Sequence, residues 1–325
     1  MKVLFVTATR LGDAVLSMGL LDHVVRTWPE ARLTIVCGPL PAPLFEAVPG
    51  LEALVVLRKR SYHRHWLELW TRVRKTRWDL VIDLRDSVVS RLIPAGKRFI
   101  KSASTTPGRH KVEQNAAIMN LKEAPAPRLW LTNAARARAR QILADAGPVL
   151  GIGPTANWAA KIWPPECFIA VVRELIKPDG LMPRARVAVF AAENENHLAR
   201  PVADAIPTEL LVDLIGKTDV ALAAALLERC SLYVGNDSGL MHLAAAAGTP
   251  TVGLFGPGRP DLYHPWGRHA IYVSAPEPGA LLAGGRGFDP GNTPCLMTAL
   301  TVGAVLEELQ RFWPVVRREV MGDAA

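Results

Sequence analysis

The sequence predicts an α/β protein made of two doubly wound parallel sheets. The chain has 325 residues, more than one compact domain usually holds, so two domains of about 150 residues each are expected. Buried runs rich in β-branched residues alternate with helical segments, as in strands joined by crossover helices. Gly147 and Pro148 interrupt this pattern, which then starts again. We therefore expect one domain at residues 1–146 and a second at residues 147–325.

Both domains are predicted from the same repeating unit. At the N-terminus, residues 2–9 form an apolar run, residues 10–13 a turn, and residues 14–28 carry helical periodicity, which together indicate a strand and helix of a parallel sheet. Further strands are predicted at residues 33–37, 54–57, 80–84, 149–153, 186–190, 209–214, 231–234 and 251–255, and further helices at residues 64–75, 133–146 and 302–313. Ligands of such sheets bind at the edge where the strands end.

The composition is that of a globular protein with excess positive charge. The net charge is +8, and residues 58–77 contain eight basic residues and one acidic residue. This predicts an acidic partner, namely nucleic acid, an anionic membrane, or a phosphorylated or carboxylated substrate. The four cysteines are far apart, so no disulfide framework or zinc site is predicted and a reducing cytoplasm fits best. Residues 1–6 are predicted to be a strand and not a signal sequence.

A polar turn follows the predicted strand at residues 231–234. Asn236, Asp237, Ser238 and Gly239 stand where a helix should begin, and the free backbone N–H groups of a helix N-terminus favour phosphate. His242 follows one turn later. The alternative is an ordinary strand-to-helix connection with a capping residue.

Three charged side chains lie in other loops at the predicted strand ends. Asp13 is either a carboxylate that stabilises a helix N-terminus or a general base that deprotonates an attacking hydroxyl. Lys161 is either solvated or positioned to neutralise a departing phosphate. Glu195 is either an exposed loop residue or a partner for ribose hydroxyls. The sequence contains no D-x-D pair and no G-x-G-x-x-G fingerprint.

The helix predicted at residues 64–75 is basic and amphipathic. Trp66, Trp70 and Val73 lie on one face and basic residues surround them. Such a helix either lies on an anionic membrane surface or covers a sheet with one solvated face.

Several motifs follow one another along nearly the whole chain. They are Leu11-Gly12-Asp13-Ala14-Val15-Leu16, His110-Lys111-Val112-Glu113-Gln114-Asn115, Lys161-Ile162-Trp163-Pro164-Pro165-Glu166, Asp237-Ser238-Gly239-Leu240-Met241-His242-Leu243-Ala244 with Phe255-Gly256-Pro257, and the segment from Pro294-Cys295-Leu296-Met297 to Val305. In order and spacing these motifs resemble glycosyltransferase family 9, the ADP-heptose:lipopolysaccharide heptosyltransferases. The chain departs from the family pattern at Gly19, at Ala191-Ala192 and at Gly258-Arg259.

The resemblance implies a GT-B fold, in which two Rossmann-like domains face a cleft, with acceptor bound by the N-terminal domain and donor nucleotide by the C-terminal domain. It implies inverting transfer of a heptose from ADP-heptose to the lipopolysaccharide inner core, without a metal or other cofactor. The enzyme is then expected in the cytoplasm, peripherally bound to the inner face of the inner membrane.

The resemblance also implies roles for individual residues. Asp13 would be the general base and Lys161 would bind the donor phosphates. The donor would further be bound by Glu195, Asp237, Ser238, Gly239, Leu240 and His242. The basic residues of the N-terminal domain supply the candidates for the anionic acceptor, namely Arg64, Arg98, Lys101 and Arg109.

Two other functions remain open at this point. A sugar-nucleotide epimerase or hydrolase of GT-B type would use Asp13 and Glu195 without an acceptor. A nucleic-acid-binding module would use the basic residues, but the aromatic residues are not interleaved with them as stacking platforms. We therefore expect no nucleic-acid partner.

Overall fold

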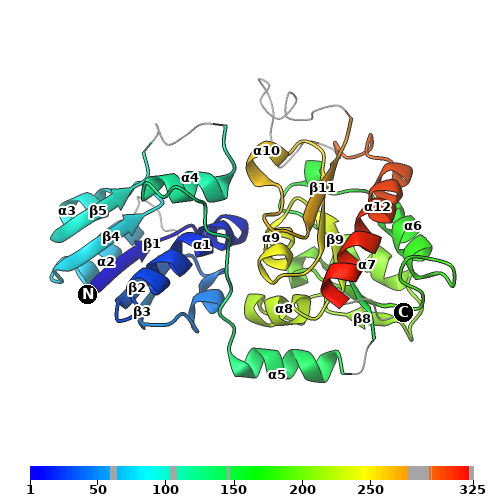
Figure 1. Ribbon diagram of the computed structural model, residues 1–325, viewed down its shortest axis with the longest axis horizontal. Coiled ribbons are helices and arrows are strands. Elements are labelled where there is room, and N and C mark those ends of the chain that lie inside the picture. The colour runs from blue at the N-terminus through cyan, green and yellow to red at the C-terminus, as the bar shows by residue number, and fades with distance from the viewer. Residues whose placement is uncertain (59–63, 103–107, 145–146, 277–292, 294, 322–325) are drawn as a thin grey trace. The chain divides into compact units, whose positions relative to one another are not determined.

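The computed structural model divides into two compact units, residues Met1–Ala135 and Arg136–Ala325 (Figure 1). It describes all residues except 59–63, 103–107, 145–146, 277–292, 294 and 322–325. The boundary predicted near residue 146 lies outside the described residues. By backbone contacts the units divide within helix α5 (Asn133–Ile142). There the Arg136 guanidinium donates two hydrogen bonds of 2.9 Å to the Glu228 carboxylate and joins α5 to the second unit.

The first unit is a parallel sheet of five strands in the order β3-β2-β1-β4-β5. The strands are β1 (Lys2–Val6), β2 (Arg32–Cys37), β3 (Leu51–Val56), β4 (Trp78–Asp83) and β5 (Ala95–Ile100). The chain runs outward from β1 to β3 and then returns to β4, which pairs with the other side of β1. Such a reversal creates a topological switch point between β1 and β4.

Helices cover both faces of this sheet. They are α1 (Leu11–Thr27), η1 (Ala42–Phe45), α2 (Arg64–Val73), α3 (Val88–Leu92) and α4 (Lys111–Ile118). Leu69 and Val73 of α2 and Val89 of α3 pack in one core with Leu4 and Val6 of β1. The alternate residues of β1 point to the opposite face, where α1 packs against α4.

The helix predicted at residues 64–75 therefore covers the sheet. Val73 is 2% exposed, and Trp66 and Trp70 pack against the same core. Guanidinium groups cover the two indole rings, Arg85 over Trp66 at 4.9 Å and Arg74 over Trp70 at 4.7 Å. The predicted aromatic face thus contacts the protein itself.

Gly19 in α1 has a specific packing role. A Cβ atom at this position would lie 1.9 Å from the Pro125 carbonyl oxygen, so the segment around Pro125 crosses α1 in direct backbone contact. The Asn115 amide of α4 also donates a 3.0 Å hydrogen bond to the Leu16 carbonyl of α1. The hydrogen bond holds α4 against the first half of α1.

The second unit is a parallel sheet of six strands in the order β11-β10-β9-β6-β7-β8. The strands are β6 (Val149–Gly153), β7 (Arg186–Val189), β8 (Leu211–Asp213), β9 (Leu232–Asn236), β10 (Thr251–Phe255) and β11 (Ala270–Ser274). The chain extends from β6 to β8 on one side and from β9 to β11 on the other. The switch point of this unit lies between β6 and β9.

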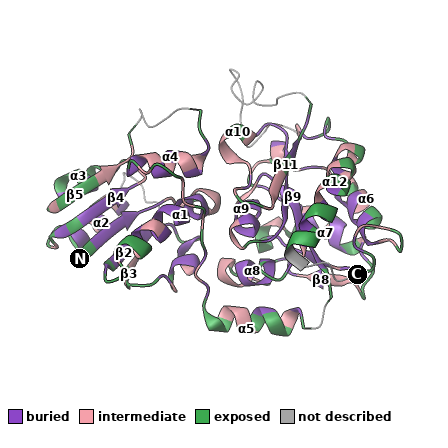
Figure 2. Cartoon of the chain, viewed as in Figure 1, coloured by how far each residue is buried: buried purple, intermediate pink, exposed green. Residues whose placement is uncertain are grey.

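Seven helices and two short 3₁₀ turns are described in the second unit. They are α5, η3 (Ala159–Lys161), α6 (Pro165–Ile176), η4 (Glu193–Glu195), α7 (Asn196–Asp204), α8 (Val220–Leu227), α9 (Gly239–Ala246), α10 (Pro260–Tyr263) and α12 (Val302–Met321). The core contains Trp163, which is 0% exposed and donates its indole N–H to the Leu300 carbonyl at 2.8 Å. Figure 2 shows the central strands β1, β4 and β9 as buried.

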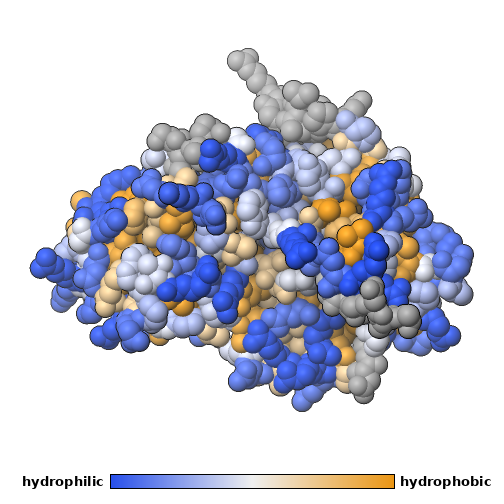
Figure 3. All heavy atoms as spheres, viewed as in Figure 1, coloured by the Kyte–Doolittle hydropathy of each residue, from blue (hydrophilic) through white to orange (hydrophobic). Residues whose placement is uncertain are grey.

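The outer surface contrasts with these cores. Figure 3 shows the arginine-rich helix α5 as a hydrophilic surface. Within the described residues, no helix is both long and apolar enough to cross a membrane.

Candidate functional site

The switch point of the second unit brings together two loops that are far apart in the sequence. One follows β6 and contains Lys161, and the other follows β9 and contains Asp237. The Lys161 ammonium lies 2.5 Å from the Asp237 carboxylate, and the side chains are 15% and 8% exposed. Lys161 also lies over the Trp158 ring, at 4.7 Å from its centre. Lys161 is thus held at the strand ends rather than extended into solvent.

Burial and the charge of Lys161 act in opposite directions on the pKa of Asp237. Burial raises the pKa of the Asp237 carboxyl above its usual value, and the charge and hydrogen bond of Lys161 oppose this rise. Glycine is needed nearby, because a Cβ at position 258 would lie 2.5 Å from Asp237 Oδ2. The departure from the family pattern at Gly258 therefore brings the backbone of that loop directly against the ion pair.

Asn236 connects the two loops through side-chain hydrogen bonds. Its side chain is fully buried, accepts a 3.2 Å hydrogen bond from the Trp163 N–H and donates a 2.9 Å hydrogen bond to the Pro154 carbonyl. Because one amide satisfies a backbone group on each side, the Lys161 loop is fixed relative to the end of β9. The sequence analysis placed Asn236 in the turn without assigning it this role.

The N-terminus of α9 supplies unsatisfied backbone donors at the same place. Ser238 is the N-cap residue, but its side chain makes no capping hydrogen bond. Gly239 and Leu240 form the first turn, and His242 is 4% exposed within the helix. The first N–H groups of a helix lack partners inside it and carry the positive end of its dipole. Together with Lys161 they make this edge a suitable site for a diphosphate.

Glu195 lies in η4, which follows β7, the strand next to β6. Its carboxylate accepts hydrogen bonds from the Thr155 hydroxyl at 2.8 Å and the Ala192 N–H at 3.1 Å. Thr155 is in the loop after β6, so Glu195 belongs to the same group of residues as Lys161. Thr155 was missed in the sequence, where only its position directly after a buried strand could have indicated it.

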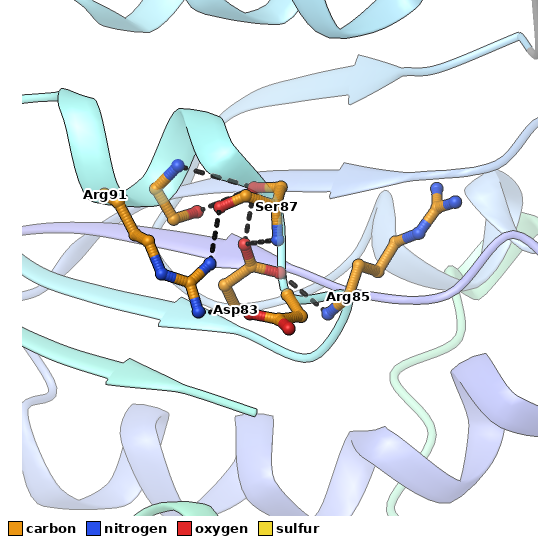
Figure 4. Close-up of polar contacts among 6 residues, drawn as sticks. Asp83, Arg85, Ser87 and Arg91 are labelled. Carbon is orange, nitrogen blue, oxygen red and sulfur yellow. Dashed lines mark hydrogen bonds and ion pairs between the residues drawn. The ribbon is translucent and has the colours of Figure 1, made fainter. Parts of the chain in front are cut away.

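The switch point of the first unit also contains carboxylates. Asp13 lies in the first turn of α1, after β1. Asp83 ends β4, is fully buried, and accepts hydrogen bonds from the N–H groups of Arg85 and Ser87 and from the Ser87 hydroxyl (Figure 4). Figure 4 shows that the Arg85 side chain points away from Asp83. Asp83 thus shapes the loop after β4, whereas Asp13 is half-buried and available at the edge.

Lys111 lies near Asp13, and Lys101 lies near Lys111. Burial lowers the pKa of Lys111, the positive charge of Lys101 lowers it further, and the charge of Asp13 raises it. The Lys111 ammonium also donates a 2.8 Å hydrogen bond to Gln114. Lys101 follows β5 and its N–H donates to the Asp83 carbonyl. Lys101 was predicted to bind the acceptor, but Lys111 was not. Lys111 occupies the variable position of the H-x-V-E segment.

The other predicted acceptor residues lie apart from one another. Arg98 donates hydrogen bonds to the carbonyl groups of Ser90, Ile93 and Ala95 and so caps the end of α3. Arg109 is exposed in the turn before α4, and Arg64 is exposed at the start of α2. Because α2 and α4 cover opposite faces of the sheet, these two arginines do not form one cluster.

Arg259, where the chain departs from the family pattern, is exposed and pairs with Asp261 at the start of α10. In the part of the chain that the structure describes, no three His, Cys, Asp or Glu residues are grouped to hold a metal ion.

The two Rossmann-like units and the polar strand ends of the second unit fit a glycosyltransferase, and the comparisons with known proteins show this class. The family model described as glycosyltransferase family 9 (heptosyltransferase) matches residues 66–281, and the chain belongs to this family. It is similar to lipooligosaccharide heptosyltransferase 2 of Haemophilus influenzae, with 24% identity over 95% of this chain and 98% of the relative. It is also similar to lipopolysaccharide heptosyltransferase 2 of Escherichia coli K12, with 26% identity over 84% and 88%.

Solved structures agree on the fold. A family 9 glycosyltransferase from Veillonella parvula has a TM-score of 0.79 at 19% identity and covers 97% of both chains. The E. coli ADP-heptose lipopolysaccharide heptosyltransferase II has a TM-score of 0.76 at 22% identity over 97% and 99%. E. coli heptosyltransferase WaaC, solved with ADP, has a TM-score of 0.72 at 20% identity over 96% and 99%. These likenesses confirm the α/β fold of two Rossmann-like units.

Proposed function

We propose that this enzyme transfers a heptose from ADP-heptose to an anionic inner-core acceptor of lipopolysaccharide, with inversion and without a metal ion. The observation that carries the proposal is the Lys161–Asp237 pair beside the α9 N-terminus, at the switch point of the second unit. The names of the relatives support the heptose and the acceptor, because they are lipopolysaccharide and lipooligosaccharide heptosyltransferases. The name of the E. coli ADP-heptose lipopolysaccharide heptosyltransferase II supports the donor.

In this proposal the second unit binds the donor. Lys161 and the first N–H groups of α9 bind the diphosphate, with Asp237, Ser238, Gly239, Leu240 and His242 lining that site. Glu195 accepts hydrogen bonds from the ribose hydroxyls. Lys161 and the helix dipole supply the positive charge that a divalent cation provides elsewhere. This arrangement supports a metal-independent reaction, and activity that survives a chelator would test it.

The reaction is a direct displacement at the anomeric carbon. Asp13 accepts the proton of an acceptor hydroxyl as its oxygen forms a bond to that carbon. The bond from the carbon to the phosphate oxygen breaks at the same time, and ADP leaves with the electron pair. Because the attack occurs opposite the leaving group, the configuration at the carbon is inverted.

The acceptor side is proposed around Asp13. Lys111 carries positive charge near Asp13, Lys101 carries it near Lys111, and both would bind phosphate or carboxylate groups of the core. Arg109, exposed just before Lys111, extends this positive region. Arg98 is occupied by three backbone carbonyl groups, and Arg64 is on the other face of the sheet, so neither is assigned to the acceptor here.

The second part of the proposal is that the enzyme binds peripherally to the cytoplasmic face of an anionic membrane, and Arg64 is assigned to this role. The three large apolar side chains with the greatest exposure among the described residues are Leu67 at 60%, Val88 at 67% and Leu92 at 68%. They lie on α2 and α3, which pack against each other. Basic residues surround them on the same elements, including Arg64, Arg72 and Arg91. We call Leu67, Val88 and Leu92 the α2–α3 surface, and its composition suits an anionic bilayer.

Transfer from ADP-heptose to truncated core acceptors tests the proposed function. Purified enzyme in excess chelator is expected to add the mass of one heptose to the acceptor and to release one ADP per transfer. NMR of the product is expected to show an inverted anomeric configuration. Sugar-nucleotide turnover that needs no acceptor would instead favour an epimerase or hydrolase.

A further inference from the structure

Tyr233 of β9 occupies a slot made of glycines at the switch point. Gly151 and Gly153 lie on β6, and Gly151 is in register with Tyr233 and Gly153 with Gly235 of β9. A Cβ at Gly153 would lie 1.9 Å from the Tyr233 hydroxyl oxygen, and one at Gly235 would lie 2.4 Å from it. The phenol ring therefore runs along the sheet over these glycines, and its hydroxyl reaches the strand ends that support the donor site.

The Tyr233 hydroxyl lies there without a partner. The residue is 0% exposed, and within the described residues neither its hydroxyl nor Ser238 Oγ makes a hydrogen bond. The two groups are neighbours all the same. Burial raises the pKa of Tyr233 well above its usual value, and Ser238 lowers it by less. Ser238 thus lies near enough to interact with the Tyr233 hydroxyl, and Tyr233 keeps its proton.

The Ser238 hydroxyl likewise lacks a hydrogen bond within the described residues. As the N-cap residue of α9 its hydroxyl would normally accept a hydrogen bond from a backbone N–H of the first turn, but it accepts none. Two adjacent buried hydroxyls with unused hydrogen-bonding capacity are unfavourable for folding alone. A phenylalanine would fill the glycine slot equally well without a buried hydroxyl.

We propose that Tyr233 is a positioning residue of the donor site that acts through Ser238. This inference rests on the proposed function, because it requires a diphosphate above α9. An anionic phosphate oxygen can only accept, so Ser238 must donate its proton to that oxygen. Ser238 Oγ is then free to accept a hydrogen bond from Tyr233, and this chain of two hydrogen bonds polarises the serine toward the phosphate. Donor binding thereby satisfies both hydroxyls.

Binding of ADP to Tyr233→Phe, measured by calorimetry, tests this inference. The variant keeps the ring and removes only the hydroxyl. Its dissociation constant for ADP is expected to rise about fivefold, as for the loss of one hydrogen bond, and the KM for ADP-heptose is expected to rise with it. The melting temperature of the free protein is expected not to fall. Tyr272→Phe on β11, an equal chemical change at a residue that is 45% exposed, is the control and should bind ADP like the wild type.

A double-mutant cycle distinguishes a positioning role from a general packing effect. In a Ser238→Ala background, Tyr233→Phe is expected to cause no further loss of ADP affinity, since its effect passes through Ser238. Equal affinity of the wild type and Tyr233→Phe for ADP would overturn the inference, as would additive effects in the cycle. If the wild type binds no ADP at all, the proposed function fails as well.

Discussion

In the proposed donor site, Lys161 and Asp237 form a buried ion pair whose role would be to prepare the site for binding. The desolvated carboxylate keeps the lysine in place at the strand ends, and the lysine opposes the rise in the Asp237 pKa that burial causes. An incoming diphosphate can then share the ammonium without reorganisation of the loop, because Asn236 already fixes it. The pair is therefore better explained by preorganisation than by its contribution to stability.

Replacement of Lys161 tests this interpretation. Lys161→Ala is expected to lower kcat/KM for ADP-heptose about 100-fold or more, because a charge that stabilises the leaving diphosphate is lost. Since the variant leaves Asp237 unpaired, Lys161→Met/Asp237→Asn is measured alongside it to separate folding from catalysis. Lys177→Ala removes another ion-paired lysine, at the far end of α6, and should retain full activity. Wild-type kinetics for Lys161→Ala would contradict the assignment.

Asp213, at the end of β8, gives a prediction on pH and stability. Burial raises the pKa of its carboxyl, but hydrogen bonds from Lys217, the Ile215 N–H and Arg200 outweigh this and leave the pKa below its ordinary value of 3.8. Because the pKa is lower in the folded state, the ionised Asp213 carboxylate stabilises the fold at neutral pH. This contribution is lost as the pH falls through the folded-state pKa. Asp213→Asn is therefore expected to be about 1 kcal/mol less stable than the wild type at pH 7.

The difference in free energy of unfolding between the wild type and Asp213→Asn should shrink as the pH is lowered below about 4, where the unfolded-state aspartate becomes protonated. Urea unfolding of both proteins between pH 7 and pH 3 measures it. A difference that stays constant over this range would show that the carboxylate charge is not responsible.

At the scale of elements, the α2–α3 surface carries the prediction on membranes. Wild-type protein is expected to sediment with vesicles that contain anionic lipid and to be released by salt. Leu67→Ser/Val88→Ser/Leu92→Ser is expected to bind about tenfold more weakly or worse, because three apolar side chains no longer enter the bilayer. Leu40→Ser replaces a side chain that is 56% exposed elsewhere in the first unit and should bind normally. Equal binding of the triple variant and the wild type would exclude this surface.

The strands differ in how well the sequence predicted them. The predicted strands at residues 149–153 and 251–255 match β6 and β10, whose residues are all buried. β5 and β11 were not predicted. They lie at the edges of their sheets, and β5 contains a glycine, a lysine and an arginine and has no fully buried residue. An edge strand needs no continuous apolar run, so hydrophobic patterning does not reveal it.

At the scale of the whole molecule, each unit has candidate site residues at its own switch point. This placement follows from the strand order, and the sequence indicated it because Asp13, Lys161, Glu195 and Asp237 all follow predicted strands. The family resemblance added their roles. The contacts between those loops could not be predicted, since they depend on register between β6 and β9. The roles of Asn236, Thr155 and Tyr233 therefore emerged only from the structure.

The central claim is that Asp13 on the first unit removes the acceptor proton while the second unit binds the donor. The most direct test is the rate of heptose transfer by Asp13→Asn, measured together with its affinity for ADP. Transfer is expected to fall about 1,000-fold, as for loss of a general base, with the ADP dissociation constant unchanged. Transfer by Asp13→Asn at the wild-type rate would contradict the account.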